Sequence, residues 1–157
     1  MKTPPPYHYV ESGLHNVWLV DGVEHVDSPY GKGVSIKDLD GLHRRIAQCL
    51  VQKPGPLTGA EFRFLRVELD LSQSAVGRLC RRDHRTVRGW ESSDAIAEPE
   101  NTIIRHVYRQ RFNRSVSFER LSLVIQESQL SDREPYEFKL QMTDGDWNVI
   151  AASATAP

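Results

Sequence analysis

The stretch LDLSQSAVGRLCRRDHRTVRGWE, residues 69–91, predicts two short helices joined by a tight turn. Ser72 precedes the first of them, expected over 73–80, as a capping residue. The turn is expected at 81–83 and the second helix at 84–91. Helices this short must cross steeply if the second is to protrude from the fold, so one of its faces has to be buried on the first.

The second helix has two different faces. Val87 and Trp90, three residues apart, form the apolar face, and Gly77 is small where the two helices are expected to cross. The opposite face carries four residues: His84, Arg85, Arg88 and Gly89. Arginine is suited to guanine because it donates two hydrogen bonds to O6 and N7, each such pair being worth about 1–3 kcal/mol of discrimination.

The segment resembles the Cro/repressor-type (XRE) helix-turn-helix family, whose pattern is roughly x-L-S-Q-x-x-L-A-x-x-L-G-V-S-x-x-T-V-S-x-W-E. The matching residues follow that pattern without a gap: Leu71-Ser72-Gln73, Val76-Gly77, Cys80, Thr86-Val87 and Trp90-Glu91. The main departure is Arg81-Arg82, where the family usually has glycine and an apolar residue. The resemblance implies a DNA-binding domain over 59–113, including a preceding helix at 59–70.

The resemblance also implies roles for individual residues. Its base-contacting positions fall on the start of the second helix and one turn later: His84, Arg85, and Arg88 or Gly89. Its phosphate-holding glutamine falls on Gln73, and we expect further phosphate contacts from Arg81, Arg82 and Thr86.

Each of these roles has a structural alternative. His84 could cap its helix without contacting DNA, and the arginines could be solvated side chains on the surface. Glu91 is expected to be the structural partner of an arginine, because its charge repels phosphate. Arg105 and Arg109, one turn apart on a later helix, could flank the DNA or lie on a solvated face.

Charge is distributed unevenly along a chain of 157 residues whose formal net charge is only −1. The window 78–88 contains five arginines and a single acidic residue: Arg78, Arg81, Arg82, Arg85 and Arg88 against Asp83. A local basic patch is what attraction to phosphate requires, and a near-neutral total can conceal it.

The N-terminal part, 1–53, is expected to be β-rich and to end in a helix. Strands are predicted at 8–10, 16–20, 23–26 and 34–36, with Asp21-Gly22 as a hairpin turn, 30–33 as a loop and a helix from Asp38 or Asp40 to about Val51. Pro54-Gly55-Pro56 then predicts a linker over 54–58, and Thr58 with Glu61 forms a capping-box pattern.

This layout resembles the front half of MqsA-type antitoxins, in which a small zinc-binding domain precedes a helix and a helix-turn-helix. Besides the layout, the resemblance rests on Glu11-Ser12-Gly13-Leu14. The zinc ligands are absent, since the two cysteines, Cys49 and Cys80, form no Cys-x-x-Cys pair and are expected to be buried thiols. We therefore expect no metal and no cofactor.

The C-terminal part, 114–157, is expected to hold a helix at 118–129 and two strands, 136–142 and 146–151, joined at Thr143-Asp144-Gly145. It could pair with the same element of a second subunit or dock a protein partner. Pairing between subunits is the interpretation we favour, because two-fold dimers suit pseudo-palindromic DNA sites.

The sequence as a whole predicts an α+β, non-enzymatic regulator. It has no Gly-rich phosphate loop, no G-x-S-x-G motif, no long apolar run and no signal peptide, so a cytoplasmic, nucleoid-associated bacterial protein is expected. We expect a homodimer that binds a double-stranded, pseudo-palindromic operator and represses its own operon. Three alternatives remain open: an antitoxin that binds both a toxin and its promoter, a protein-interaction module with a degenerate helix-turn-helix, and an accessory DNA-binding protein of a mobile element.

Overall fold

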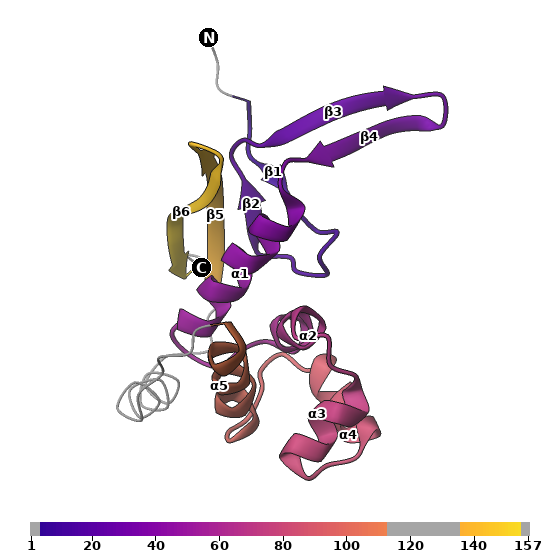
Figure 1. Ribbon diagram of the computed structural model, residues 1–157, viewed down its shortest axis with the longest axis vertical. Helices are drawn as coiled ribbons and strands as arrows, with labels where there is room; N and C mark the ends of the chain where they lie inside the picture. The colour runs from indigo at the N-terminus through magenta and orange to yellow at the C-terminus, as the bar shows by residue number, and fades with distance from the viewer. Residues whose placement is uncertain (1–3, 113–135, 155–157) are drawn as a thin grey trace. The chain divides into compact units, whose positions relative to one another are not determined.

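The computed structural model describes residues 4–112 and 136–154 and has the α+β fold expected from the sequence (Figure 1). The helix predicted at 118–129 lies outside the described residues. The described elements are, in chain order, β1 (Tyr7–His8), β2 (Val17–Leu19), β3 (Val23–Ser28), β4 (Gly31–Ile36), α1 (Leu39–Gln52), α2 (Gly59–Glu68), α3 (Gln73–Cys80), α4 (His84–Glu91), α5 (Glu100–Phe112), β5 (Tyr136–Thr143) and β6 (Asp146–Ala154).

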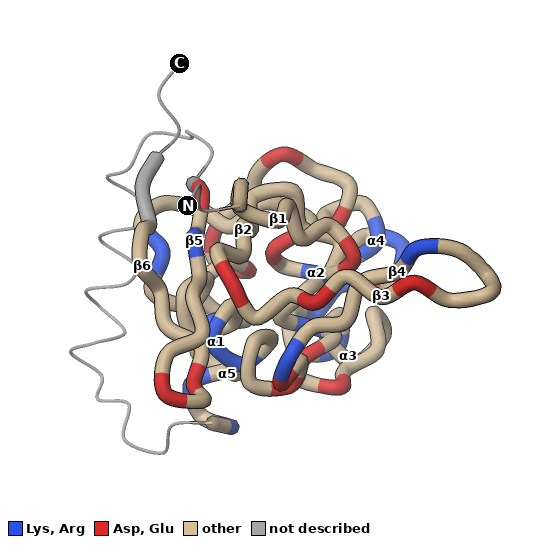
Figure 2. The backbone as a smooth tube through the Cα atoms, turned by 90° about the horizontal axis from the view of Figure 1, so that it is seen from above, with Lys and Arg blue, Asp and Glu red and all other residues tan. Residues whose placement is uncertain are grey.

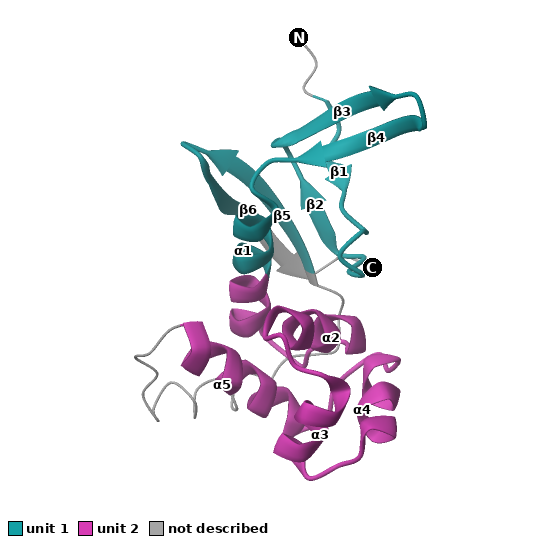
Figure 3. Ribbon diagram, turned by 45° about the vertical axis from the view of Figure 1, so that its right-hand side comes forward, with its two compact units in different colours: residues 1–46, 134–157 teal, residues 47–133 magenta. Residues whose placement is uncertain are grey.

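The chain divides into two compact units (Figure 3). Unit 1 combines both ends of the chain, Met1–Ile46 and Glu134–Pro157, and unit 2 is Ala47–Arg133. These boundaries differ from the expected segments 1–53, 54–58, 59–113 and 114–157. Helix α1 contributes to both units, and the C-terminal hairpin belongs with the N-terminal strands.

Unit 1 contains a four-stranded sheet in the order β1-β2-β5-β6. Strand β5 runs parallel to β2, with Val17 opposite Phe138 and Leu19 opposite Leu140, and these four side chains are buried. The β5–β6 hairpin has the predicted turn, with Asp144 at φ 54° and Gly145 at φ 85°. Apolar residues alternate along β5, and pairing with β2 places them on the same buried face of the sheet as Val17 and Leu19, which explains why the hairpin joins the N-terminal sheet.

The prediction of a hairpin turn at Asp21-Gly22 is wrong. Strand β2 pairs with β1 and β5, while β3 pairs with β4, so this dipeptide connects two sheets. Contacts with the C-terminal hairpin hold it there, since Asp21 accepts a hydrogen bond from the Met142 amide at 2.6 Å. Gly22, at φ 75°, lies against the Trp147 ring, which a Cβ would approach to 2.6 Å.

The β3–β4 ribbon is longer than expected. Its ladder runs from Val23 opposite Ile36 to Ser28 opposite Gly31. The segment expected to be a loop at 30–33 therefore lies largely in β4, because its glycines take part in pairing through their backbone.

Unit 2 is a helical bundle whose core includes apolar residues from all its described helices: Ala47, Leu50, Val51, Leu57, Phe62, Phe64, Leu65, Leu69, Val76, Val87, Ile96, Ile104 and Tyr108. The segment predicted to be a linker is folded into this bundle. The Leu57 amide donates to Asn101 Oδ1 at 3.0 Å, and the Leu57 carbonyl accepts from the Ile96 amide at 2.8 Å.

Arg105 is buried, so both interpretations, that it flanks DNA and that it lies on a solvated face, are wrong for this residue. Arg105 is only 2% exposed and donates to the carbonyls of Lys53 at 2.7 Å and Gly55 at 2.5 Å. Arg109 is half-buried and donates to the Val51 carbonyl at 3.2 Å. Both arginines satisfy carbonyls at and beyond the C-terminal end of α1, which explains their one-turn spacing.

Candidate nucleic-acid interface

Helix α2 provides the base on which the following two helices pack. Its capping box is formed as predicted, since the Glu61 amide donates to Thr58 Oγ1 at 3.2 Å and the Thr58 amide donates to Glu61 Oε1 at 2.8 Å. Gly59 lies directly against the end of α4, because a Cβ there would come within 2.5 Å of the Trp90 carbonyl oxygen. Close backbone packing therefore fixes where α4 ends on α2.

Gly77 lies against the turn between α3 and α4, whereas the sequence led us to expect it where the two helices cross. The Arg82 amide donates to the Gly77 carbonyl at 2.8 Å, and a Cβ on Gly77 would lie 2.5 Å from the Arg82 carbonyl oxygen. On α4, Val87 is fully buried and Trp90 makes an edge contact with Phe62, with ring centroids 6.0 Å apart. These contacts fix the orientation of α4 about its own axis.

The turn between α3 and α4 forms although it lacks glycine. Arg81 caps the C-terminus of α3 at φ 58° and ψ 42°, a left-handed conformation that glycine adopts more easily. For other residues this conformation costs about 1–2 kcal/mol. Arg81 thus occupies the left-handed position at the end of α3 that glycine would adopt at lower cost.

The N-terminus of α4 is capped by Asp83 and not by His84. Asp83 Oδ1 accepts hydrogen bonds from the Thr86 amide at 2.8 Å and from Thr86 Oγ1 at 2.7 Å. These bonds lower the pKa of the Asp83 carboxyl, so the cap stays ionised at neutral pH. The alternative of His84 as a cap is therefore wrong, and the Thr86 hydroxyl already has a partner within the protein.

Glu91 of α4 connects its helix to α2 and α3. Its carboxylate forms a short ion pair with Arg66 of α2, which confirms the expectation that Glu91 pairs with an arginine. It also accepts a hydrogen bond from Gln73 Nε2 of α3 at 2.9 Å. Arg66 additionally donates to the Leu71 carbonyl at 2.9 Å. This network fixes the start of α3 relative to the end of α4.

Arg66 is a positioning residue that no sequence pattern indicates. Neither its spacing nor its neighbours distinguish it from other charged residues on α2, because its partners follow it by 5 and 25 residues. Gln73 was predicted to hold a phosphate, and its amide is oriented by Glu91.

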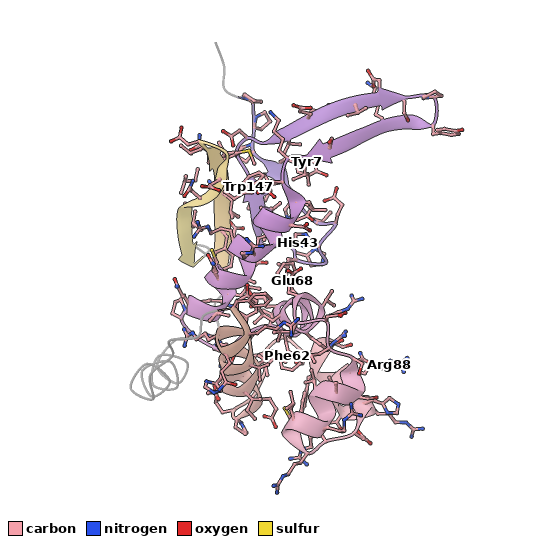
Figure 4. The ribbon with its side chains drawn as sticks, in the orientation of Figure 1. Tyr7, His43, Phe62, Glu68, Arg88 and Trp147 are labelled. Carbon is pink, nitrogen blue, oxygen red and sulfur yellow. The ribbon has the colours of Figure 1, made fainter. Side chains whose placement is uncertain are left out.

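The outer surface of α3, the turn and α4 is strongly basic. We call it the arginine surface, and it consists of Arg78, Arg81, Arg82, His84, Arg85, Arg88 and Gly89, all of which are exposed. Figure 2 marks arginine positions in blue at α4, and Figure 4 shows Arg88 extending outward from that helix. The predicted base-contacting residues share one side of α4 by their helical spacing, and Arg81 and Arg82 are exposed in the turn that precedes it.

Arg85 and Arg88 share the exposed side of α4, and among the described residues their guanidinium groups have no hydrogen-bonding or ion-pair partner. The one acidic side chain within the segment 78–88, Asp83, is hydrogen-bonded to Thr86. The donors of both guanidinium groups are thus available to an anionic or hydrogen-bond-accepting ligand.

Other kinds of site are not evident in the part of the chain that the structure describes. There, no group of three or more His, Cys, Asp or Glu residues could hold a metal ion. In the same residues, no helix is both long enough and apolar enough to cross a membrane. Cys49 and Cys80 form no disulfide and are half-buried, where the sequence led us to expect fully buried thiols. The pKa of the Cys80 thiol is raised, mainly by burial and also by the nearby Glu100 charge.

Comparisons of the chain with protein-family models, with curated proteins and with solved structures give no match.

Proposed function

We propose that this protein is a sequence-specific DNA-binding transcriptional regulator that inserts α4 into the major groove. One observation carries the proposal. Helix α4 buries Val87 completely and exposes Arg85 and Arg88 on its other side. A helix held in this way can enter the groove as a rigid element, and its arginines can make bidentate contacts to guanine.

Residues of α3 and of the α3–α4 turn supply sequence-independent contacts in this proposal. Arg81 and Arg82 contact phosphates beside the groove, and Gln73 adds a hydrogen bond at the start of α3. Thr86 takes no phosphate contact in this proposal, because its amide and its hydroxyl both donate to Asp83. His84 contacts a base edge from the first turn of α4. The protein acts as a homodimer on a pseudo-palindromic operator with half-sites about 34 Å apart, represses its own operon and works at the bacterial nucleoid in the cytoplasm.

Replacing Arg85 or Arg88 with alanine is expected to weaken binding to the DNA upstream of the protein's own gene by about 5- to 150-fold, since each change removes a bidentate base contact. Gel shifts across a salt series, with unrelated DNA as competitor, measure the effect. Arg44→Ala is the matched control, because it removes the same charge from an exposed position on α1.

Two results would contradict the proposed function. One is that the wild type fails to bind DNA at low salt, which would favour a protein-interaction module. The other is that the Arg85→Ala and Arg88→Ala proteins keep the affinity and site preference of the wild type.

Arg81→Gly is expected to increase the free energy of unfolding by about 1 kcal/mol, because glycine removes the cost of the left-handed conformation. The same change is expected to weaken binding to operator and unrelated DNA alike. The slope of log affinity against log salt concentration should fall by about one unit, as for the loss of one phosphate contact. An unchanged salt slope would show that Arg81 contacts no phosphate.

A further inference from the structure

Gly89 is in a helix where glycine brings no structural advantage. It lies in α4 without a left-handed backbone angle, and a Cβ added there would meet no atom within 4 Å. Glycine inside a helix costs about 0.5–1 kcal/mol relative to alanine. The isolated fold would therefore be more stable with alanine at this position.

The other glycines in the described helices differ from Gly89. A Cβ on Gly59 would clash with the backbone at the end of α4, and a Cβ on Gly77 would clash with the backbone of the α3–α4 turn. A Cβ on Gly41 would overlap the Asp38 carboxylate, which accepts a hydrogen bond from the Gly41 amide. Gly89 is thus the helical glycine of the described residues whose small size the protein itself does not require.

The position of Gly89 indicates what requires it. It follows Arg85 by four residues, so the two share one side of α4, and both are exposed. We propose that Gly89 is the point of closest approach between α4 and the DNA, and that the missing side chain lets the helix backbone enter the groove deeply enough for Arg85 and Arg88 to contact bases. This inference rests on the proposed function and adds a residue that determines specificity without donating a hydrogen bond.

A side chain at position 89 would hold the axis of α4 away from the bases. Bidentate contacts are directional and would be lost first. Phosphate contacts from long arginine side chains, such as Arg81 and Arg82, can follow a small displacement. The change should therefore lower affinity for the operator and leave affinity for unrelated DNA nearly unaltered.

The test is Gly89→Ala in the full-length protein, with melting temperature and DNA affinity measured on the same samples. We expect the melting temperature to rise by about 1–4 °C. We expect affinity for the operator to fall by about 5- to 150-fold, equivalent to one lost base contact, while binding to unrelated DNA stays the same. Gly33→Ala is the matched control, because Gly33 is an exposed glycine of β4 whose added Cβ would meet only a carbonyl oxygen at 3.9 Å.

The outcomes separate this inference from the proposed function. A Gly89→Ala protein that melts higher and binds the operator like the wild type, while Arg85→Ala binds weakly, overturns the role of Gly89 alone. A melting temperature lower than that of the wild type overturns the premise that the fold does not need this glycine. A wild type that does not bind DNA overturns the proposed function together with this inference.

Discussion

Arg105→Met is expected to lower the free energy of unfolding of unit 2 by about 3–5 kcal/mol, although Arg105 touches no part of the arginine surface. Its guanidinium group donates to the carbonyls of Lys53 and Gly55, and also to Val51 at 3.4 Å. Methionine has similar length but no donor, so buried carbonyls would lose their partners at about 1–3 kcal/mol each. Urea unfolding followed by helical circular dichroism measures the loss.

Arg105→Lys is the informative companion variant. Lysine keeps the positive charge, but its single ammonium group cannot reproduce the planar arrangement of donors. We expect it to recover only part of the loss. If Arg105→Met changes the free energy of unfolding by less than about 1 kcal/mol, the carbonyls are satisfied in another way and the anchoring role of Arg105 is wrong.

Arg105 also illustrates where interpretation of the sequence fails. Its spacing from Arg109 is that of two neighbours on a charged helix face, and the sequence contains no mark of the partners more than 50 residues earlier. Backbone carbonyls at the end of a helix leave no trace in residue type. A buried arginine that binds carbonyls therefore cannot be distinguished, from sequence, from a solvated or DNA-contacting one.

The two-helix segment, in contrast, could be predicted almost to the residue. Ser72 and Thr58 cap their helices as expected, and the burial of Val87 follows from a pattern within about 20 residues. Such features depend on local hydrogen bonds and on helical periodicity. The same local physics explains why the candidate site, which lies within one short stretch, could be identified before the structure was known.

Strand pairing could be predicted only where it is local. The β5–β6 hairpin follows from its Asp-Gly turn, but pairing of Val17 with Phe138 joins segments about 120 residues apart. An Asp-Gly dipeptide between apolar stretches also suggested a hairpin at Asp21-Gly22. There, burial of Trp147 against Gly22 and the bond from Met142 to Asp21 replace the local pairing.

Lys53→Met is expected to lower the free energy of unfolding by about 3–5 kcal/mol, because it leaves the buried Glu61 carboxylate without its cation. Lys53 Nζ lies 2.6 Å from Glu61 Oε1, and the two side chains are 4% and 1% exposed. The same carboxylate oxygen accepts the capping bond from the Thr58 amide. Glu61→Gln is expected to cost a similar amount, since it retains an acceptor for the cap but isolates the Lys53 charge.

The double variant, Lys53→Met with Glu61→Gln, distinguishes a pair that acts as a unit from two independent residues. Neither charge is then left unpaired in the core, so we expect the double variant to be clearly more stable than the sum of the single losses predicts, with a coupling energy of more than about 1 kcal/mol. Strictly additive losses in urea unfolding would show that the ion pair contributes no coupling.

Lys53 also accepts a hydrogen bond from Arg105 through its backbone carbonyl. The Lys53–Glu61 ion pair therefore attaches this segment to α2, and the Arg105 bonds attach it to α5. Loss of either attachment should loosen the base beneath α3 and α4, so variants at Lys53 and Arg105 are expected to weaken DNA binding in proportion to the unfolded fraction, whereas Arg85 and Arg88 variants weaken it without unfolding.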